Sequence, residues 1–162
     1  MNRILVLGGG VGGTLVANLL AKKLRSRIAF GDVDITLVDE RGAHVYQPGF
    51  MYIAMGGERA EKLQRPERSL LDHRVNLVIG RATHIEESLQ TVALDDGRVL
   101  RYTHLVLATG SRIVPEEIPF FEQEAQHFYS AEAALKLRRE LDHFSGGRIV
   151  IGIAGMPYKC PP

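Results

Sequence analysis

The sequence is poor in several features that would point to a particular class of protein. Its 162 residues include one cysteine and no tryptophan. A single cysteine excludes a disulfide bond within the chain. No apolar run approaches the ~20 residues that a membrane-spanning helix needs. No secretory signal is recognisable before the first apolar segment, so we expect a reducing, cytoplasmic location.

An excess of charge of either sign is also missing. Lys and Arg number 20 and Asp and Glu number 19, which leaves a formal net charge of +1. Proteins that bind nucleic acid usually carry a strong positive field, so we expect no nucleic-acid partner. The six histidines show no ligand spacing with one another or with the cysteine. We therefore expect no metal site, and only His44, in the loop expected over residues 40–57, is singled out for testing.

The N-terminal third has the pattern of a βαβ unit. Residues 3–8 form a short apolar run that ends in glycine, which is typical of a buried parallel strand. Residues 11–25 place leucines and valine at helical spacing and end in basic residues. Residues 33–40 form a second apolar strand. The crossover between the two strands is expected to be right-handed.

The turn between the first strand and the helix is rich in glycine. Gly8, Gly10 and Gly13 have the G-x-G-x-x-G spacing, and Gly12 lies among them. The first glycine of this motif allows a tight turn, the second lets the backbone approach a pyrophosphate, and the third lets the helix pack closely on the sheet. The flanking strand and helix supply the context that this short motif requires. A glycine-rich turn that binds nothing is the alternative.

An acid at the end of the second strand suggests ribose recognition. Asp39 lies further past Gly13 than the typical ~20 residues, which a long connection before the strand would explain. Asp34 has the more typical spacing but opens the strand, at the wrong edge of the sheet. A carboxylate at position 39 favours FAD or NAD over NADP. The alternative is that Asp39 is a simple turn residue.

The rest of the chain changes in pattern several times. Residues 40–57 are expected to be a loop with a short helical turn, and residues 58–72 a helix interrupted near Pro66. Short strands follow from residue 75, with Asp96-Gly97 as a hairpin turn. A helix is expected from the N-cap Ser130 to the glycines at 146 and 147, followed by a buried strand over residues 148–155.

A strand that ends in Ala108-Thr109-Gly110 completes a recognisable order of motifs. The order is glycine motif, acid, three-stranded meander and A-T-G, over residues 3–113. It resembles the FAD-dependent disulfide oxidoreductases with two dinucleotide-binding domains. The resemblance implies an α/β fold: a Rossmann-like FAD-binding βαβ unit with an inserted three-stranded β-meander, followed by the start of a second Rossmann-like domain. The implied divisions are FAD domain (1–113), connector and helix (114–146), and truncated second domain (147–162).

The last residues favour one branch of that superfamily. "GIAGMPYKCPP" stands where a second glycine motif would be, and "HVYQPGFMYIAMG" is similar to a proline-containing loop near the flavin. Both resemble the sulfide:quinone oxidoreductases and flavocytochrome c sulfide dehydrogenase. The resemblance implies that Cys160 is catalytic. It also implies that FAD is bound by the following residues: Gly8, Gly10, Gly12, Gly13, Asp39, Glu40, Arg41, Gln47, Pro48, Ala82, Ala108, Thr109 and Gly110.

The activity implied by the resemblance is oxidation of sulfide. Sulfide sulfur would attack a disulfide or persulfide that involves Cys160, and electrons would pass to FAD and then to quinone. The partner cysteine would lie beyond residue 162. "AQHFYSAEA" holds no cysteine to attach the flavin covalently. Outside this resemblance, a lone cysteine is more often a small buried hydrophobe.

Three other functions stay open on the sequence alone. They are a type II NADH dehydrogenase, a flavocytochrome c-like flavoprotein and a non-catalytic FAD-binding fragment. Family members are more than twice as long, so we expect this chain to be a truncated piece. Such a piece should bind FAD weakly without turnover, and should aggregate or form a homo-oligomer through an exposed strand edge. The resemblance implies that the missing C-terminal half carries the contacts with quinone and a peripheral contact with the inner face of a membrane.

Overall fold

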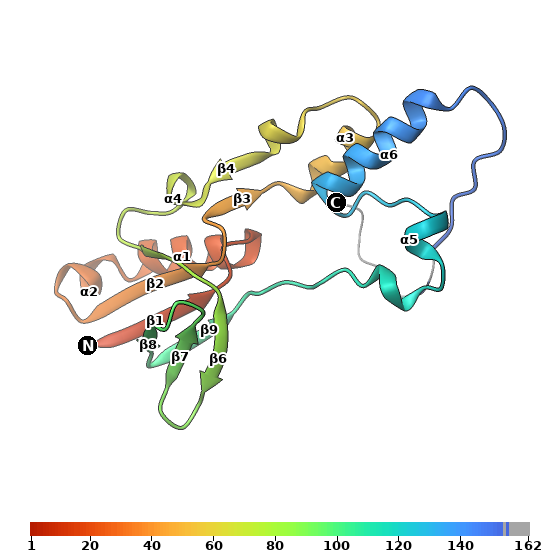
Figure 1. Cartoon of the computed structure of the whole chain (residues 1–162). Helices are drawn as coiled ribbons and strands as arrows, with labels where there is room; N and C mark the ends of the chain where they lie inside the picture. The colour runs from red at the N-terminus through yellow and green to blue at the C-terminus, as the bar shows by residue number, and fades with distance from the viewer. Residues whose placement is uncertain (154, 156–162) are drawn as a thin grey trace. The chain divides into compact units, whose positions relative to one another are not determined.

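The computed structural model of the chain describes residues 1–153 and 155, and divides them into two compact units (Figure 1). The first unit comprises Met1–His44 and Arg65–Ser111, and the second comprises Val45–Gln64 and the residues from Arg112 onward. Each unit has its own hydrophobic core, and each is described by itself below. Among the described residues, no helix has the length and apolar character needed to cross a membrane.

A parallel sheet of four strands forms the centre of the first unit. Its strand order is β5-β2-β1-β9, and the strands are β1 (Asn2–Leu7), β2 (Val33–Asp39), β5 (Asn76–Ile79) and β9 (His104–Leu107). All three neighbouring pairs are parallel. Buried parallel strands are uniformly apolar because both faces are covered. The predicted βαβ unit is therefore confirmed in its strands.

The helix of the βαβ unit is also confirmed. The side of the helix that is buried carries small residues, and the side with the large apolar residues is exposed. Helix α1 (Val11–Lys23) buries Gly13, Thr14, Ala17 and Ala21 and is followed by the short α2 (Arg25–Ala29). The larger Val11, Leu15 and Leu19 are more than half exposed. Small side chains face the sheet because the glycine turn brings the helix close to it.

The three-stranded meander packs on part of the parallel sheet, and the two form a second hydrophobic core between them. Strands β6 (Ala82–Glu86), β7 (Thr91–Leu94) and β8 (Val99–Arg101) form an antiparallel sheet in that order. The predicted hairpin turn is confirmed, since Gly97 has a φ of +86° and its N–H donates to the carbonyl of Leu94 at 3.1 Å. Val92, Leu94 and Tyr102 pack with Leu5, Leu7 and Val38 of the parallel sheet.

The helix expected over residues 58–72, with an interruption near Pro66, is formed only as two short pieces on either side of that proline. This segment contains η2 (Ala60–Leu63), β4 (Gln64–Pro66) and the single turn α4 (Glu67–Leu70), and β4 pairs with β3 (Ala43–Val45). Pro66 has no N–H and favours an extended residue before it, so a continuous helix is excluded. Instead, the chain turns at Pro66, and the N–H of Glu67 donates to the carbonyl of Gly42 at 2.9 Å.

The second unit is built around two helices. The short helix α3 (Phe50–Ala54), which follows η1 (Gln47–Gly49), packs on α6 (Ala131–His143) through Phe50, Ile53, Ala54 and Ala134. The connector holds η3 (Pro115–Glu117) and α5 (Phe121–Glu124). The predicted N-cap is confirmed, because the Ser130 hydroxyl accepts from the N–H of Ala133 at 3.1 Å.

Replacing Ser130 by alanine should lower the free energy of unfolding by about 1 kcal/mol, the usual contribution of an N-cap side chain. Denaturant unfolding followed by the helical circular dichroism signal measures it. Ser145→Ala is the matched control, because Ser145 is exposed and lies after the helix. Equal losses in the two variants would contradict the assigned cap.

The buried strand expected over residues 148–155 is not formed in its described part. Residues 148–153 belong to no strand and are exposed, with Val150 at 81% and Ile151 at 92%. A parallel strand needs neighbours to satisfy its backbone N–H and C=O groups, and none of the described strands pairs with this segment. The remaining residues of the motif, including Cys160, lie outside the described residues.

Candidate functional site

The C-terminal ends of the parallel strands meet at a hollow of about 290 Å³. Ligands of open α/β sheets bind at this edge. The residues lining the hollow are Leu7, Gly8, Val38, Asp39, Glu40, Gly80, Arg81, Ala82 and Thr109. The structure thus brings together predicted site residues from β1, β2, β6 and the end of β9.

Two glycines of the motif are required by the packing of the protein itself. Gly8 has a φ of +105°, and a Cβ there would lie 2.3 Å from the carbonyl oxygen of Ala108. A Cβ on Gly13 would lie 1.8 Å from the carbonyl oxygen of Gly8. These contacts agree with the predicted roles in the tight turn and in close packing of helix and strand. They would be needed whether or not a ligand binds.

The other two glycines are not explained by protein contacts. A Cβ on Gly10 or Gly12 would meet no heavy atom within 4 Å, and Gly10 has an ordinary φ of −77°. Gly10 is the N-cap of α1, and no side chain caps the helix there. The first N–H groups of a helix have no intrahelical acceptor and attract anions. The open space beside these glycines fits a pyrophosphate that the backbone approaches closely.

The Asp39 carboxylate accepts hydrogen bonds from three backbone N–H groups. Its Oδ1 accepts from the N–H of Gly9 at 3.0 Å, and its Oδ2 accepts from the N–H groups of Arg41 at 2.9 Å and Gly42 at 2.5 Å. The carboxylate therefore ties the glycine loop to the turn after β2. A carboxylate has about four acceptor positions, so one remains for a ribose hydroxyl. The exposed neighbour Glu40 lines the same hollow.

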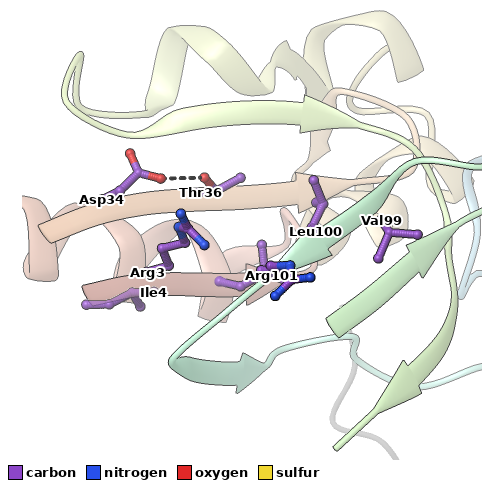
Figure 2. Close-up of a pocket in the computed structure, with 8 residues that line it drawn as sticks. Arg3, Ile4, Asp34, Thr36, Val99, Leu100 and Arg101 are labelled. Atoms are coloured by element: carbon purple, nitrogen blue, oxygen red, sulfur yellow. Dashed lines mark hydrogen bonds between the residues drawn. The ribbon is translucent and has the colours of Figure 1, made fainter. Parts of the chain in front are cut away.

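Asp34 lies at the opposite end of β2, as expected. It lines a second hollow of about 340 Å³ together with Arg3, Thr36 and Arg101, and that hollow contains no predicted site residue (Figure 2). Its carboxylate accepts from Asn76 Nδ2 at 2.7 Å and from the Thr36 hydroxyl at 3.3 Å. Asp34 is thus excluded from the hollow beside the glycine motif.

The remaining predicted residues fall into three places. Ala108 packs against Gly13. Gly110 has a φ of +70°, and a Cβ on it would meet no heavy atom within 4 Å. Arg41 is exposed in the turn after β2. Gln47 and Pro48 belong to the second unit, in η1. Among the described residues, no group of three His, Cys, Asp or Glu side chains is placed to hold a metal ion.

A buried polar cluster beneath the glycine loop was missed by sequence reasoning. Glu67 is completely buried, and its Oε1 accepts from the Thr14 hydroxyl at 2.6 Å. His44 Nδ1 lies 3.1 Å from Glu67 Oε2 and 3.0 Å from the carbonyl oxygen of Gly9. Only His44 was singled out from the sequence. A glutamate in a polar, charged stretch carries no signal of burial.

The segment that carries Glu67 is itself firmly anchored. The Arg68 guanidinium donates to the carbonyls of Val75 at 2.6 Å, Leu71 at 3.0 Å and Asp72 at 2.6 Å. The hydrogen bond from the Arg74 side chain holds the pKa of Asp72 well below its usual value. The turn after α4 is therefore held by charged groups, which fixes Glu67 where it lies.

Comparison with known proteins agrees with this geometry. The family model described as pyridine nucleotide-disulphide oxidoreductase matches residues 2–155. The sulfide-quinone reductase of Aquifex aeolicus (strain VF5) is 30% identical over 152 residues, which are 92% of this chain and 34% of that protein. The X-ray structure of the sulfide:quinone oxidoreductase from Aquifex aeolicus superposes with a TM-score of 0.69 at 27% identity, over 88% of this chain and 32% of that one.

A second type of enzyme also matches. The type II NADH:quinone oxidoreductase Ndh of Mycobacterium tuberculosis (strain ATCC 25618 / H37Rv) is 29% identical over 142 residues, which are 85% of this chain and 29% of that protein. The chain therefore spans about a third of the length of these relatives.

Proposed function

Because this chain belongs to the pyridine nucleotide-disulphide oxidoreductase family, we propose that it forms an FAD-binding region of a sulfide:quinone oxidoreductase-type enzyme. The observation that carries the proposal is the open space beside Gly10 and Gly12, at the N-terminus of α1. Neither glycine is required by a protein neighbour, so a ligand that the backbone approaches gives the reason for both.

The proposed cofactor contacts follow the edge of the sheet. The N–H groups that begin α1 would bind the pyrophosphate, and Asp39 and Glu40 would bind the adenosine ribose. Ala82, Ala108, Thr109 and Gly110 would line the path of the cofactor. Arg41, in the turn after β2, is proposed to contact it, and Gln47 and Pro48, in η1, are proposed as cofactor-binding residues. When bound, the flavin would supply the two-electron redox step.

The proposed substrate is sulfide, and the proposed electron acceptor is quinone. Support comes from the names of the matched relatives, the sulfide-quinone reductase and the sulfide:quinone oxidoreductase of Aquifex aeolicus. Cys160 is proposed as the residue that takes up sulfide sulfur: sulfide would attack the sulfur–sulfur bond of an oxidised Cys160, held as a disulfide or persulfide, and would displace a thiolate. The electron pair of that thiolate would pass to the flavin and then to quinone. Sulfide would lose two electrons, and the quinone would take up two electrons and two protons.

The test is made on the full-length protein. The purified protein should show a flavin spectrum, and sulfide should bleach it in the absence of quinone. A soluble quinone should then restore the absorbance and give steady turnover. Unchanged absorbance with sulfide would contradict the proposal. For the 162-residue chain alone, we expect weak FAD binding and no turnover, and steady turnover would contradict that part.

The second candidate is a type II NADH:quinone oxidoreductase, which the Mycobacterium tuberculosis relative favours. Adding NADH in place of sulfide distinguishes the two candidates. Bleaching of the flavin by NADH would favour a type II NADH:quinone oxidoreductase. Bleaching by sulfide alone would favour a sulfide:quinone oxidoreductase-type enzyme. Reduction of a cytochrome in place of quinone would instead favour a flavocytochrome c-type enzyme.

The proposed place of action is the cytoplasm or the inner face of a membrane. Quinones dissolve in the bilayer, so an enzyme that reduces them must reach its surface. Fractionation in the presence and absence of high salt would separate a peripheral protein from a free one. A homo-oligomer is proposed as well, and size-exclusion chromatography with light scattering would test it.

A further inference from the structure

Side chains contact both backbone polar groups of Gly9, which lies within the glycine motif. Its N–H donates to Asp39 Oδ1 at 3.0 Å, and its carbonyl oxygen lies 3.0 Å from His44 Nδ1. The Thr14 hydroxyl is 3.3 Å from the same carbonyl. Side chains therefore fix both the N–H and the C=O of this residue. Gly10, beside the open space, is the next residue along the chain.

The hydrogen-bond directions around Glu67 follow from counting protons. His44 Nδ1 faces two acceptors, the Gly9 carbonyl and Glu67 Oε2, so it must carry a hydrogen. The Thr14 hydroxyl has one hydrogen, and at 2.6 Å it lies much closer to Glu67 Oε1 than to the Gly9 carbonyl. Glu67 thus accepts from both side chains. It orients Thr14 and keeps the hydrogen of His44 on the nitrogen that faces Gly9.

Burying a carboxylate in this space has an unfavourable desolvation free energy. Removing a charge from water is unfavourable unless it is paired and hydrogen-bonded, and an apolar side chain of similar size often stabilises a protein as well or better. Glu67 is completely buried, and its partners come from α1 and from β3. Orientation of the loop gives a reason for an acid at this position that packing does not.

We propose that Glu67 is a positioning residue for the cofactor: it keeps the hydrogen of His44 on the side of the Gly9 carbonyl and binds Thr14 at the start of α1, and thereby sets the affinity of the glycine loop for the pyrophosphate of a dinucleotide. This inference rests on the flavin-binding part of the proposed function and is independent of sulfide and quinone. Glu67 itself does not touch the open space beside the loop. Its effect on the ligand is transmitted through the Gly9 carbonyl and the start of α1.

The decisive variant is Glu67→Leu in the full chain. Leucine has a similar size but offers no acceptor to His44 or to Thr14. Both hydrogen bonds that Glu67 accepts are therefore lost. Flavin titration of the apoprotein should show affinity about 10- to 100-fold weaker. Thermal unfolding of each apoprotein is measured in parallel.

Conservative substitutions of Thr14 and His44 distinguish a loss of positioning from a loss of overall stability. Thr14→Ser and His44→Asn keep donors near the original positions and should bind flavin within about threefold of wild type, whereas Thr14→Val and His44→Leu should match Glu67→Leu. Val33→Ala is the matched control, because it removes buried methyl groups at the end of β2 opposite to the hollow. It should lower the unfolding temperature and leave flavin affinity unchanged.

Two results would overturn the inference alone. One is flavin binding by Glu67→Leu that is as tight as in wild type. The other is a loss of affinity in Val33→Ala equal to that in Glu67→Leu at equal loss of stability. A wild-type protein that binds no flavin would overturn the proposed function and this inference together, so the two failures are distinguishable.

Discussion

Sulfide no longer reduces the flavin when Cys160 is replaced by serine in the full-length protein: this is the largest effect that we expect. Serine keeps nearly the size of cysteine, but its hydroxyl is not ionised at neutral pH and does not form the sulfur–sulfur bond that the proposed reaction needs. Loss of a catalytic nucleophile lowers kcat by about 1,000-fold or more. Stopped-flow absorbance of the flavin after mixing with sulfide measures the rate.

The control for this variant is its flavin content. Cys160→Ser should bind flavin in the same stoichiometry as wild type, and a chemical reductant should bleach both proteins equally. A variant that retains sulfide-dependent reduction would show that Cys160 is structural. A variant that loses its flavin would place Cys160 in cofactor binding instead of sulfur chemistry.

Replacing Gly10 by valine should abolish flavin binding while the protein stays folded. Gly10 has a φ of −77°, which valine adopts, and its Cβ would meet no heavy atom of the protein within 4 Å. The side chain would instead occupy the open space where the pyrophosphate is proposed to lie. We expect flavin affinity to fall by about 100-fold or more, the equivalent of losing two charge-assisted hydrogen bonds. Fluorescence titration of the apoprotein measures it.

Gly13→Ala is the matched comparison within the same motif. Its Cβ would lie 1.8 Å from the carbonyl oxygen of Gly8, so helix and strand must separate. We expect a loss of about 1–3 kcal/mol in the free energy of unfolding, the usual cost of overpacking a core. Gly10→Val should lower the unfolding free energy by about 1 kcal/mol or less, because valine is a poorer N-cap than glycine but meets no protein atom. If both variants lost stability equally, the space beside Gly10 would not be a ligand site.

Several patterns that are local in sequence predicted the structure correctly. Asp96-Gly97 predicted its hairpin because a tight turn needs a positive φ, and Ser130 predicted its helix start because a hydroxyl satisfies a free N–H. Apolar runs predicted β1 and β2, and the family inferred from the order of motifs is confirmed over residues 2–155. Each of these signals depends on residues close together in the chain or on the order of such segments.

Features that depend on distant partners were not predicted. The carboxylate of Asp39 binds the N–H of Gly9, 30 positions away, and Thr14 binds Glu67, 53 positions away. The leucines at helical spacing in α1 do not mark its buried side, because Leu15 is exposed and Ala17 is buried. Composition favours leucine as a core residue, whereas the short distance between helix and sheet admits only a small side chain.

The sequence by itself determined the βαβ unit, the glycine motif, the meander and the family, because periodicity, turn residues and spacing are properties of neighbouring residues. The tertiary structure alone decided which glycines are required by the protein and which face open space, and it alone brought Glu67 under the loop. The physical reason is that steric contact and burial are set by the side chains that meet in space. Gly8 and Gly13 meet backbone atoms, and Gly10 and Gly12 meet none.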